Sequence, residues 1–263
     1  MLYQPYEVEI SQKYLQTVMS RVRGPVCLLG GWAVYIVVGE NFKREQGRDY
    51  LGSRDIDLGF HIEKEWSRNE LENSSFAVGV RTLIAMGFEP IGFRLAKHFH
   101  TDTKQELRTE DAENTPSYEI FDLFVDPVVD HIHPETRETL GFTPIDEPLL
   151  EHVFVGRKHR IIEFYGRDIL LPLPPVLLAT KLKSVSHRDK EYKRIKDIAD
   201  IYALSWYSDE RLAAVKSILS TMLSSQETQT IVDSFTKEDL DMVSNALGTE
   251  VQQIQRVLNE LKS

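Results

Sequence analysis

The chain has 263 residues, of which 41% are hydrophobic and 10% aromatic, so it can form one large domain or two modest ones. Its net charge of −10 argues against a general electrostatic affinity for nucleic acid, although it leaves room for a local basic patch. The single cysteine, Cys27, excludes an internal disulfide framework and lies in an apolar run, where we expect a buried, unreactive side chain. The sequence shows no signal peptide and no membrane span, and we expect a cytoplasmic location.

Predicted strands and helices mix in the first two thirds of the chain. The period of the apolar residues, two for strands and about 3.6 for helices, separates the two kinds of element. In chain order we predict a helix over 8–22, a strand over 25–29, a helix over 32–38 ended by Gly39, a loop over 41–51, a strand over 55–62, a helix over 76–86, strands over 88–95 and 97–100, a polar loop over 102–116, a strand over 118–127 ended by Pro127, a hairpin with a basic turn over 154–164, and a short strand over 169–171.

The last third of the chain has the pattern of helices. A proline-rich segment, 172–175, precedes this change in composition, and we place a boundary there between domains 1–172 and 173–263. Helices are predicted around 177–185, 195–202, 209–223, 237–247 and 250–261. Within this part, the basic run 187–196 is either a solvated helix face or a surface that holds phosphates.

A pair of aspartates in the stretch 52–60 indicates a metal site. Asp55 and Asp57 alternate with apolar residues on a predicted strand, so the two carboxylates share a face, roughly 6–7 Å apart. Two like charges side by side are unfavourable unless a cation lies between them. The pair therefore predicts a bound divalent metal.

The later predicted strand, 118–127, supplies a third carboxylate. An aspartate in the middle of an apolar strand is costly unless it is paired or bound to a metal, which makes Asp122 the natural partner of the first pair. Asp126 is the other candidate, four residues further on and on the same strand face. We prefer Asp122 because apolar residues flank it on both sides, whereas Asp126 next to Pro127 is typical of a strand-end turn.

Two further motifs have more than one interpretation. The pair Gly30-Gly31 between a predicted strand and a predicted helix allows a tight turn and leaves amide groups free to bind phosphate, but such turns also serve packing alone.

The pairs His98/His100 and His131/His133 have a spacing that zinc uses. No cysteine and no assignable acidic partner accompanies them, and we interpret them as edge-strand histidines.

Together these motifs resemble a known family. Over about 25–126, the chain resembles the polymerase-β-like nucleotidyltransferase superfamily. Three motifs carry the resemblance: Gly30-Gly31 after a strand, Asp55-Ile56-Asp57, and Phe121-Asp122-Leu123 on a later strand. The segments 178–182 and 188–201 are similar to the C-terminal signature of the AbiEii-type toxin nucleotidyltransferases and their uncharacterised relatives. The chain departs from the pattern in having no serine in the glycine turn and in the inserted segment 41–51.

The resemblance implies an α+β fold, with a mixed sheet flanked by helices and then a C-terminal helical domain. It implies transfer of a nucleoside monophosphate from an NTP to an acceptor hydroxyl, with two Mg²⁺ ions, or Mn²⁺, and release of pyrophosphate. The acceptor stays open among transfer RNA or other RNA, a protein and a small molecule, and an antitoxin partner is a further expectation. The alternative is a non-catalytic nucleotide-binding or partner-binding protein on the same fold.

The resemblance also assigns roles to the carboxylates and the glycine turn. Asp55 and Asp57 would bridge both metals, and Asp122 would hold the metal on the acceptor side and help to deprotonate the hydroxyl. Gly30 and Gly31 would offer backbone amides to the triphosphate.

Three other side chains receive roles from the resemblance. Ser53 would contribute a hydroxyl, and Arg54 a charge, although strand alternation points Arg54 away from the aspartates. Lys181 is the expected phosphate-contacting lysine of the helical domain, and its other interpretation is a solvated helix side chain.

Overall fold

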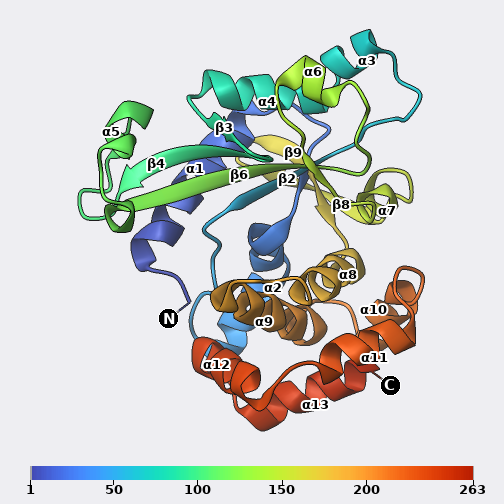
Figure 1. The fold of residues 1–263 in the computed structure, drawn as a ribbon. Coiled ribbons are helices and arrows are strands. Elements are labelled where there is room, and N and C mark those ends of the chain that lie inside the picture. Colours follow the sequence, from blue (N-terminus) through green and yellow to red (C-terminus); the bar gives the residue numbers. More distant parts are fainter. Residues whose placement is uncertain (1, 263) are drawn as a thin grey trace. The chain divides into compact units, whose positions relative to one another are not determined.

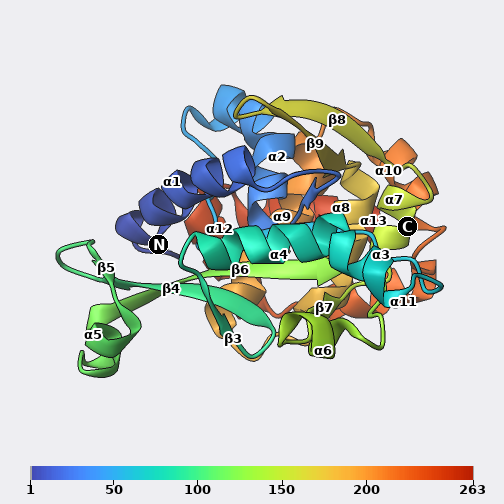
Figure 2. The same cartoon turned by 90° about the horizontal axis from the view of Figure 1, so that it is seen from above.

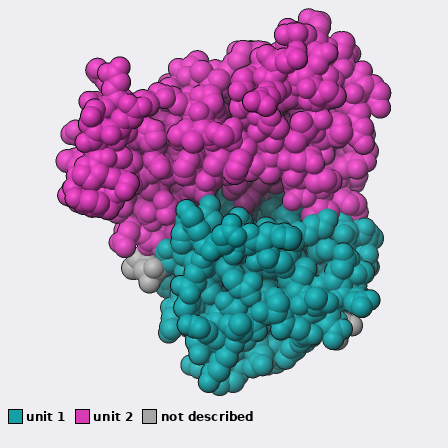
Figure 3. Space-filling view, in the orientation of Figure 1, with its two compact units in different colours: residues 1–2, 31–51, 172–263 teal, residues 3–30, 52–171 magenta. Residues whose placement is uncertain are grey.

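The computed structural model describes residues 2–262 and separates into two compact units, coloured teal and magenta in Figure 3. Unit 1 consists mainly of residues 31–51 and 172–262, and unit 2 of residues 3–30 and 52–171. The segment 31–51 groups by its contacts with the C-terminal helices, whereas the sequence placed it in the domain 1–172. Phe42 accounts for this grouping, since its ring centre lies 5.1 Å from those of both Tyr50 and Tyr207.

Unit 2 is built on one mixed sheet. Within residues 2–262 its nine strands are β1 (Cys27–Leu28), β2 (Ile56–Phe60), β3 (Glu89–Ile91), β4 (Arg94–His100), β5 (Glu106–Leu107), β6 (Ile120–Val129), β7 (Ile145–Asp146), β8 (His159–Phe164) and β9 (Arg167–Pro172). The sheet order is β3-β4-β6-β2-β1-β9-β8, with β5 added to β4 and β7 added to β6 (Figure 1). The central pair, β2 and β6, is parallel, while β4 runs antiparallel to β6.

Unit 2 also contains several helices. They are α1 (Pro5–Arg21), α3 (Arg68–Asn73), α4 (Ser75–Ala85), α5 (Thr109–Glu113), α6 (Thr136–Leu140) and α7 (Leu150–Phe154), with a short 3₁₀ helix over Ser117–Glu119. Figure 2 shows α1 and α4 lying along the same face, and both contact β6.

The two faces of the sheet differ in character because side chains alternate along each strand. On β4 and β6, Phe99 and Phe121 are buried on the face covered by α1, where Tyr14 lies 5.3 Å from Phe99 and Tyr6 lies 6.0 Å from Phe121 between ring centres. The alternate positions of the same strands form the opposite face. We call it the polar face, because it carries Arg94 and His98 on β4 and Asp122 and Asp126 on β6.

Unit 1 is helical. Its helices are α2 (Gly30–Gln46, from Gly31 onward), α8 (Pro174–Val185), α9 (Glu191–Tyr207), α10 (Leu212–Leu219), α11 (Ser225–Asp233), α12 (Lys237–Leu247) and α13 (Val251–Lys262). Apolar residues at helical spacing form its core, as in α9, where Ile198, Ile201 and Tyr202 are fully buried. None of the helices within residues 2–262 is long and apolar enough to cross a membrane.

The structure confirms the predicted α+β class, a mixed sheet with helices followed by a run of helices, and corrects several boundaries. The predicted loop over 41–51 is wrong in its first half, because α2 continues through Gly39 to Gln46. Val34, Val38 and Phe42 are buried at a spacing of four residues, and this apolar stripe carries the helix past the glycine.

Two strand predictions also change. β6 continues through Pro127 to Val129, so Pro127 does not end it; β4 pairs with β6 only as far as Val125, and the missing N–H of Pro127 costs no hydrogen bond on that side. The hairpin is β8–β9, and its turn lies at Tyr165-Gly166, where φ is 50° and 75°, instead of at the basic residues 157–160. Helix α11 has no counterpart among the predicted helices.

Candidate functional site

Three aspartates meet on the polar face of the sheet. Asp57 in β2 and Asp126 in β6 are direct partners in the parallel ladder, which places their Cα atoms about 4.8 Å apart. Asp55 comes just before β2 and, by alternation, lies on the same side of the chain as Asp57. We call Asp55, Asp57 and Asp126 the carboxylate cluster.

The guanidinium of Arg94 lies in this cluster. Its Nε and Nη2 donate to the two carboxylate oxygens of Asp126 at 2.6 and 2.7 Å, and Nη2 also donates to Oδ2 of Asp55 at 3.0 Å. The guanidinium carbon lies 3.9 Å from the centre of the Phe124 ring, a cation–π contact. Two carboxylates and an aromatic ring therefore hold one arginine, which the sequence-based prediction did not include.

Burial and crowding shift the acidity of the cluster. Burial raises the pKa of Asp126 to about 7, with the negative charges of Asp57 and Asp55 adding to the shift and Arg94 opposing it. Within the cluster, Arg94 is thus the group that favours the charged form of Asp126.

A glycine lies against the cluster at the start of α2. Gly30 has a φ of 60°, and a Cβ built on it would lie 2.6 Å from Cγ of Asp57 and closer still to one carboxylate oxygen. Only a glycine combines this left-handed conformation with such a close approach. The turn into α2 therefore brings backbone directly against the Asp57 carboxylate, and Gly31 continues from it as a buried helical residue.

The structure places Asp126, and not Asp122, beside Asp57. Asp126, taken from the sequence as a strand-end residue, lies within β6 and faces Asp57, because the strand runs on to Val129. Asp122 is instead the cross-strand partner of His98, whose Nδ1 lies 2.7 Å from its carboxylate. Four residues of strand, about 13 Å, separate Asp122 from Asp126, so Asp122 lies outside the cluster.

Ser53 and Arg54 are placed differently from one another. The Ser53 hydroxyl is bonded to the backbone oxygen of Asp55 at 3.0 Å, so it supports the loop that carries the cluster. Arg54 lies near α1, where it pairs with Glu7 at 3.3 Å and stacks over Phe121, a residue of the opposite sheet face.

Lys181 belongs to a buried ion network within unit 1. Its Nζ donates to Asp197 at 2.7 Å and lies 2.8 Å from Asp200, while Asp200 also accepts from Lys196 at 2.5 Å and from Tyr50. Burial opposes the charge of Lys181, but the two aspartates together raise its pKa above the usual value. The structure thus places Lys181 in an internal ion network and not on a solvated helix face.

The basic run 187–196 is also largely used inside unit 1. Arg188 pairs with Asp197, Arg194 makes a two-nitrogen contact with Asp239, and Lys196 pairs with Asp200. Three basic side chains of this run therefore form ion pairs inside unit 1. Their charges are balanced by protein carboxylates and need no bound phosphate.

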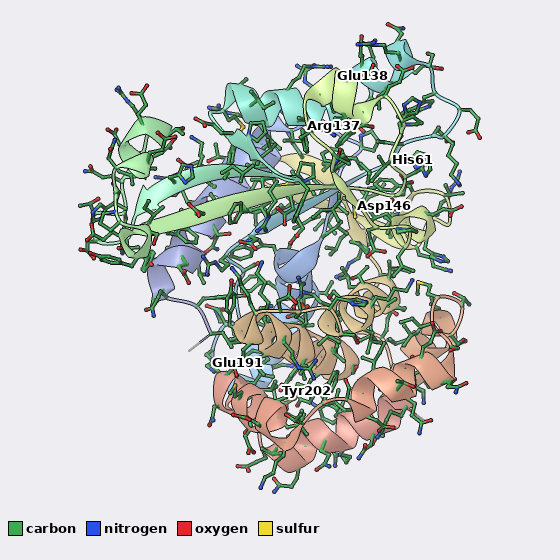
Figure 4. The ribbon with its side chains drawn as sticks, viewed as in Figure 1. His61, Arg137, Glu138, Asp146, Glu191 and Tyr202 are labelled. Atoms are coloured by element: carbon green, nitrogen blue, oxygen red, sulfur yellow. The ribbon has the colours of Figure 1, made fainter. Side chains whose placement is uncertain are left out.

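Three of the four histidines in the predicted pairs contact protein groups, and no hydrogen bond or ion pair of the fourth, His131, is seen within residues 2–262. Besides His98, His100 lies 3.7 Å from a Glu119 oxygen, and Nε2 of His133 is bonded to the backbone oxygen of Trp66 at 2.8 Å. His61, which directly follows β2 and is labelled in Figure 4, contacts the carboxylates of Asp130 and Glu63. Burial opposes its protonation, but these two hydrogen bonds raise the pKa of His61 above its usual value.

The carboxylate cluster has donor atoms that suit a divalent metal. Three carboxylates on two neighbouring strands are the oxygen donors that Mg²⁺ and Mn²⁺ prefer, and the glycine at position 30 keeps space free of a Cβ beside one of them. As they stand, however, two of the three bind Arg94, and no group of three or more acidic, histidine or cysteine side chains in residues 2–262 is arranged to hold a metal. The donor chemistry fits a divalent cation, and an internal cation competes for it.

Comparisons with known proteins give little additional information. No protein-family model matches the chain, and no curated protein matches it. Among solved structures, it is similar to an antigenic nucleotidyltransferase-like protein from Paracoccidioides brasiliensis, with 15% identity and a TM-score of 0.44 over 93% of each chain. A similarity at this level establishes neither a shared fold nor a shared activity.

Proposed function

We propose that the protein is a nucleotidyltransferase, which moves a nucleoside monophosphate from an NTP to an acceptor hydroxyl with release of pyrophosphate. The observation that carries the proposal is the carboxylate cluster, in which Asp57 and Asp126 are ladder partners and Asp55 lies beside them. Gly30, packed against Asp57 at the start of α2, supports it further. The sequence resemblance to polymerase-β-like nucleotidyltransferases points to the same reaction.

The roles of the residues follow from their chemistry. Bound Mg²⁺ or Mn²⁺ would neutralise charge on the transferring phosphate and on the leaving pyrophosphate. Asp55, Asp57 and Asp126 would hold it through their carboxylate oxygens, and Asp126 would also accept a proton from the acceptor hydroxyl. The backbone amide of Gly30, at the start of α2, would help to orient the triphosphate.

The acceptor is the less defined part of the proposal. The similarity of 178–182 and 188–201 to AbiEii-type toxin nucleotidyltransferases favours RNA, such as transfer RNA, and with it an antitoxin partner. The internal use of the basic run 187–196 in unit 1 favours a protein hydroxyl or a small molecule. The acceptor is therefore a question for direct labelling.

Incubation with α-labelled NTPs and Mg²⁺, with total RNA and with protein alone, tests the proposal. We expect one class of acceptor to become labelled by the wild-type protein, and Asp57→Asn to abolish that label while its melting curve stays cooperative. Asp146→Asn is the control, since Asp146 is an exposed residue of β7 (Figure 4). Undiminished labelling by Asp57→Asn would refute the assignment.

A second candidate is a non-catalytic nucleotide-binding or partner-binding protein. The specific observation in its favour is Arg94, whose bonds to Asp55 and Asp126 engage two members of the carboxylate cluster. Calorimetry with Mg²⁺ and each NTP separates the candidates. Tight binding without turnover on any acceptor would favour the second, and turnover would exclude it.

A further inference from the structure

Arg94 is held from several sides by groups of unit 2. Both carboxylate oxygens of Asp126 and one of Asp55 accept hydrogen bonds from it, and the Phe124 ring lies against its guanidinium. Only 17% of the side chain is exposed. A side chain in contact with two carboxylates and an aromatic face is a built-in counter-ion, since three clustered carboxylates without a cation repel one another.

We propose that Arg94 is an internal cation that occupies the carboxylate cluster when no metal is bound, and that a divalent cation binds there only by displacing it. This inference rests on the proposed function in one respect, that the cluster is the cation-binding site. It adds that the protein carries its own competitor for that site.

The competition follows from the shared oxygens. Oδ1 and Oδ2 of Asp126 both accept from Arg94, so any cation that binds this carboxylate approaches the guanidinium to within a few ångströms. Two positive charges at that separation repel strongly in a partly buried site. Arg94 and a divalent cation therefore exclude one another from the full set of cluster oxygens.

Arg94 lies at a position in the fold from which its side chain can move out of the carboxylate cluster. It is the first residue of β4, directly after the turn that joins β4 to the three-residue edge strand β3. All three residues of β3 are exposed, as is Phe93 in the turn, and Gly92 in the turn has no atom near the place of a Cβ. A rearrangement of this hairpin turn would therefore move Arg94 and leave the pairing of β2 with β6 in place.

Mn²⁺ binding to the Arg94→Gln variant tests the inference. We expect Arg94→Gln without metal to melt at a lower temperature than the wild type, because the carboxylates lose their counter-ion. Added Mn²⁺ should raise its melting temperature much more than that of the wild type, and its Kd for Mn²⁺, measured by electron paramagnetic resonance, should be at least about tenfold lower. The double variant Arg94→Gln/Asp126→Asn should lose that gain, which locates the Mn²⁺ at the cluster.

Arg194→Gln is the matched control. Arg194 also contacts one carboxylate, that of Asp239, through Nε and Nη2, but no second carboxylate is bonded to it within residues 2–262. Its replacement should lower the melting temperature with no recovery on adding Mn²⁺. An Arg94→Gln variant that behaves like Arg194→Gln, losing stability and gaining no Mn²⁺ affinity, would overturn the inference.

Two further outcomes are informative. If Arg94→Gln is unfolded without metal, folding on addition of Mn²⁺ supports the inference, and continued unfolding overturns it. If the variant gains Mn²⁺ affinity but neither it nor the wild type labels any acceptor, the inference stands and the proposed transferase activity fails. Metal binding and catalysis are thus judged by separate measurements.

Discussion

Asp122 and Asp126 lie on the same strand and the same face, but their neighbours differ. Asp126 faces Asp57 and is buried, whereas the Asp122 carboxylate is 42% exposed and pairs with His98. We expect Asp126→Asn to lower labelling of the acceptor by about a hundredfold or more, because the reacting centre loses a carboxylate that would bind the metal and accept the proton. Asp122→Asn should keep labelling within a few fold. The reverse order would show that Asp122 is the third carboxylate.

Gly30 is the second residue whose substitution is decisive. Gly30→Ala must adopt a left-handed conformation and meets the Asp57 carboxylate, so we expect a loss of about 1–2 kcal/mol from the backbone alone and more from the clash. Gly39→Ala in the same helix has open space at its Cβ and should stabilise the protein by about 0.5–1 kcal/mol. Urea unfolding of both variants measures the contrast. Equal effects would mean that position 30 is an ordinary helical position.

His61 gives a pH-dependent stability. Its folded-state pKa is raised above 6.5, so its contribution is fully present below that value and is lost as the pH rises through the folded-state pKa. His61→Gln should therefore cost about 1 kcal/mol at pH 5.5, on the scale of a hydrogen bond, and less at pH 8.5. His131→Gln, at a position without a side-chain hydrogen bond in residues 2–262, serves as control. Urea unfolding that shows a larger cost for His61→Gln at pH 8.5 would contradict the assignment.

At the scale of elements, the buried ion network joins α8 to α9. Lys181 on α8 contacts Asp197 and Asp200 on α9, and all three are buried. Lys181→Met should lower the free energy of unfolding by about 3–5 kcal/mol, because it leaves two buried carboxylates with fewer partners. Lys183→Met, at an exposed position of the same helix, should change it by less than about 0.5 kcal/mol. Equal, small effects would return Lys181 to the candidates for substrate contact.

Elements with a clear local pattern could be predicted from the sequence, and those that depend on distant partners could not. The capping box of Thr236 and Asp239 and the stop at Gly248 are local, and α12 has these ends. Continuation of α2 past Gly39 depends on packing of Phe42 against Tyr207, which lies far along the chain in α9. Continuation of β6 through Pro127 depends on where β4 stops pairing.

At the scale of the whole molecule, the same distinction explains the candidate site. Asp55 and Asp57 are two residues apart, and the period of a strand is enough to place them together. Asp126 and Arg94 join them only through the register of β6 on β2 and of β4 on β6, which no local pattern specifies. The prediction favoured Asp122 because apolar residues flank it. Such flanks indicate that a segment is buried, but they do not indicate its register against the neighbouring strands.

The central claim, nucleotidyl transfer at the carboxylate cluster, is tested most directly by comparing NTPs labelled on the α-phosphate with NTPs labelled on the γ-phosphate. We predict that the wild-type protein with Mg²⁺ transfers the α-label to its acceptor and releases the γ-label as pyrophosphate, and that Asp57→Asn does neither. Transfer of the γ-label, or equal α-label transfer by wild type and Asp57→Asn, would contradict the account.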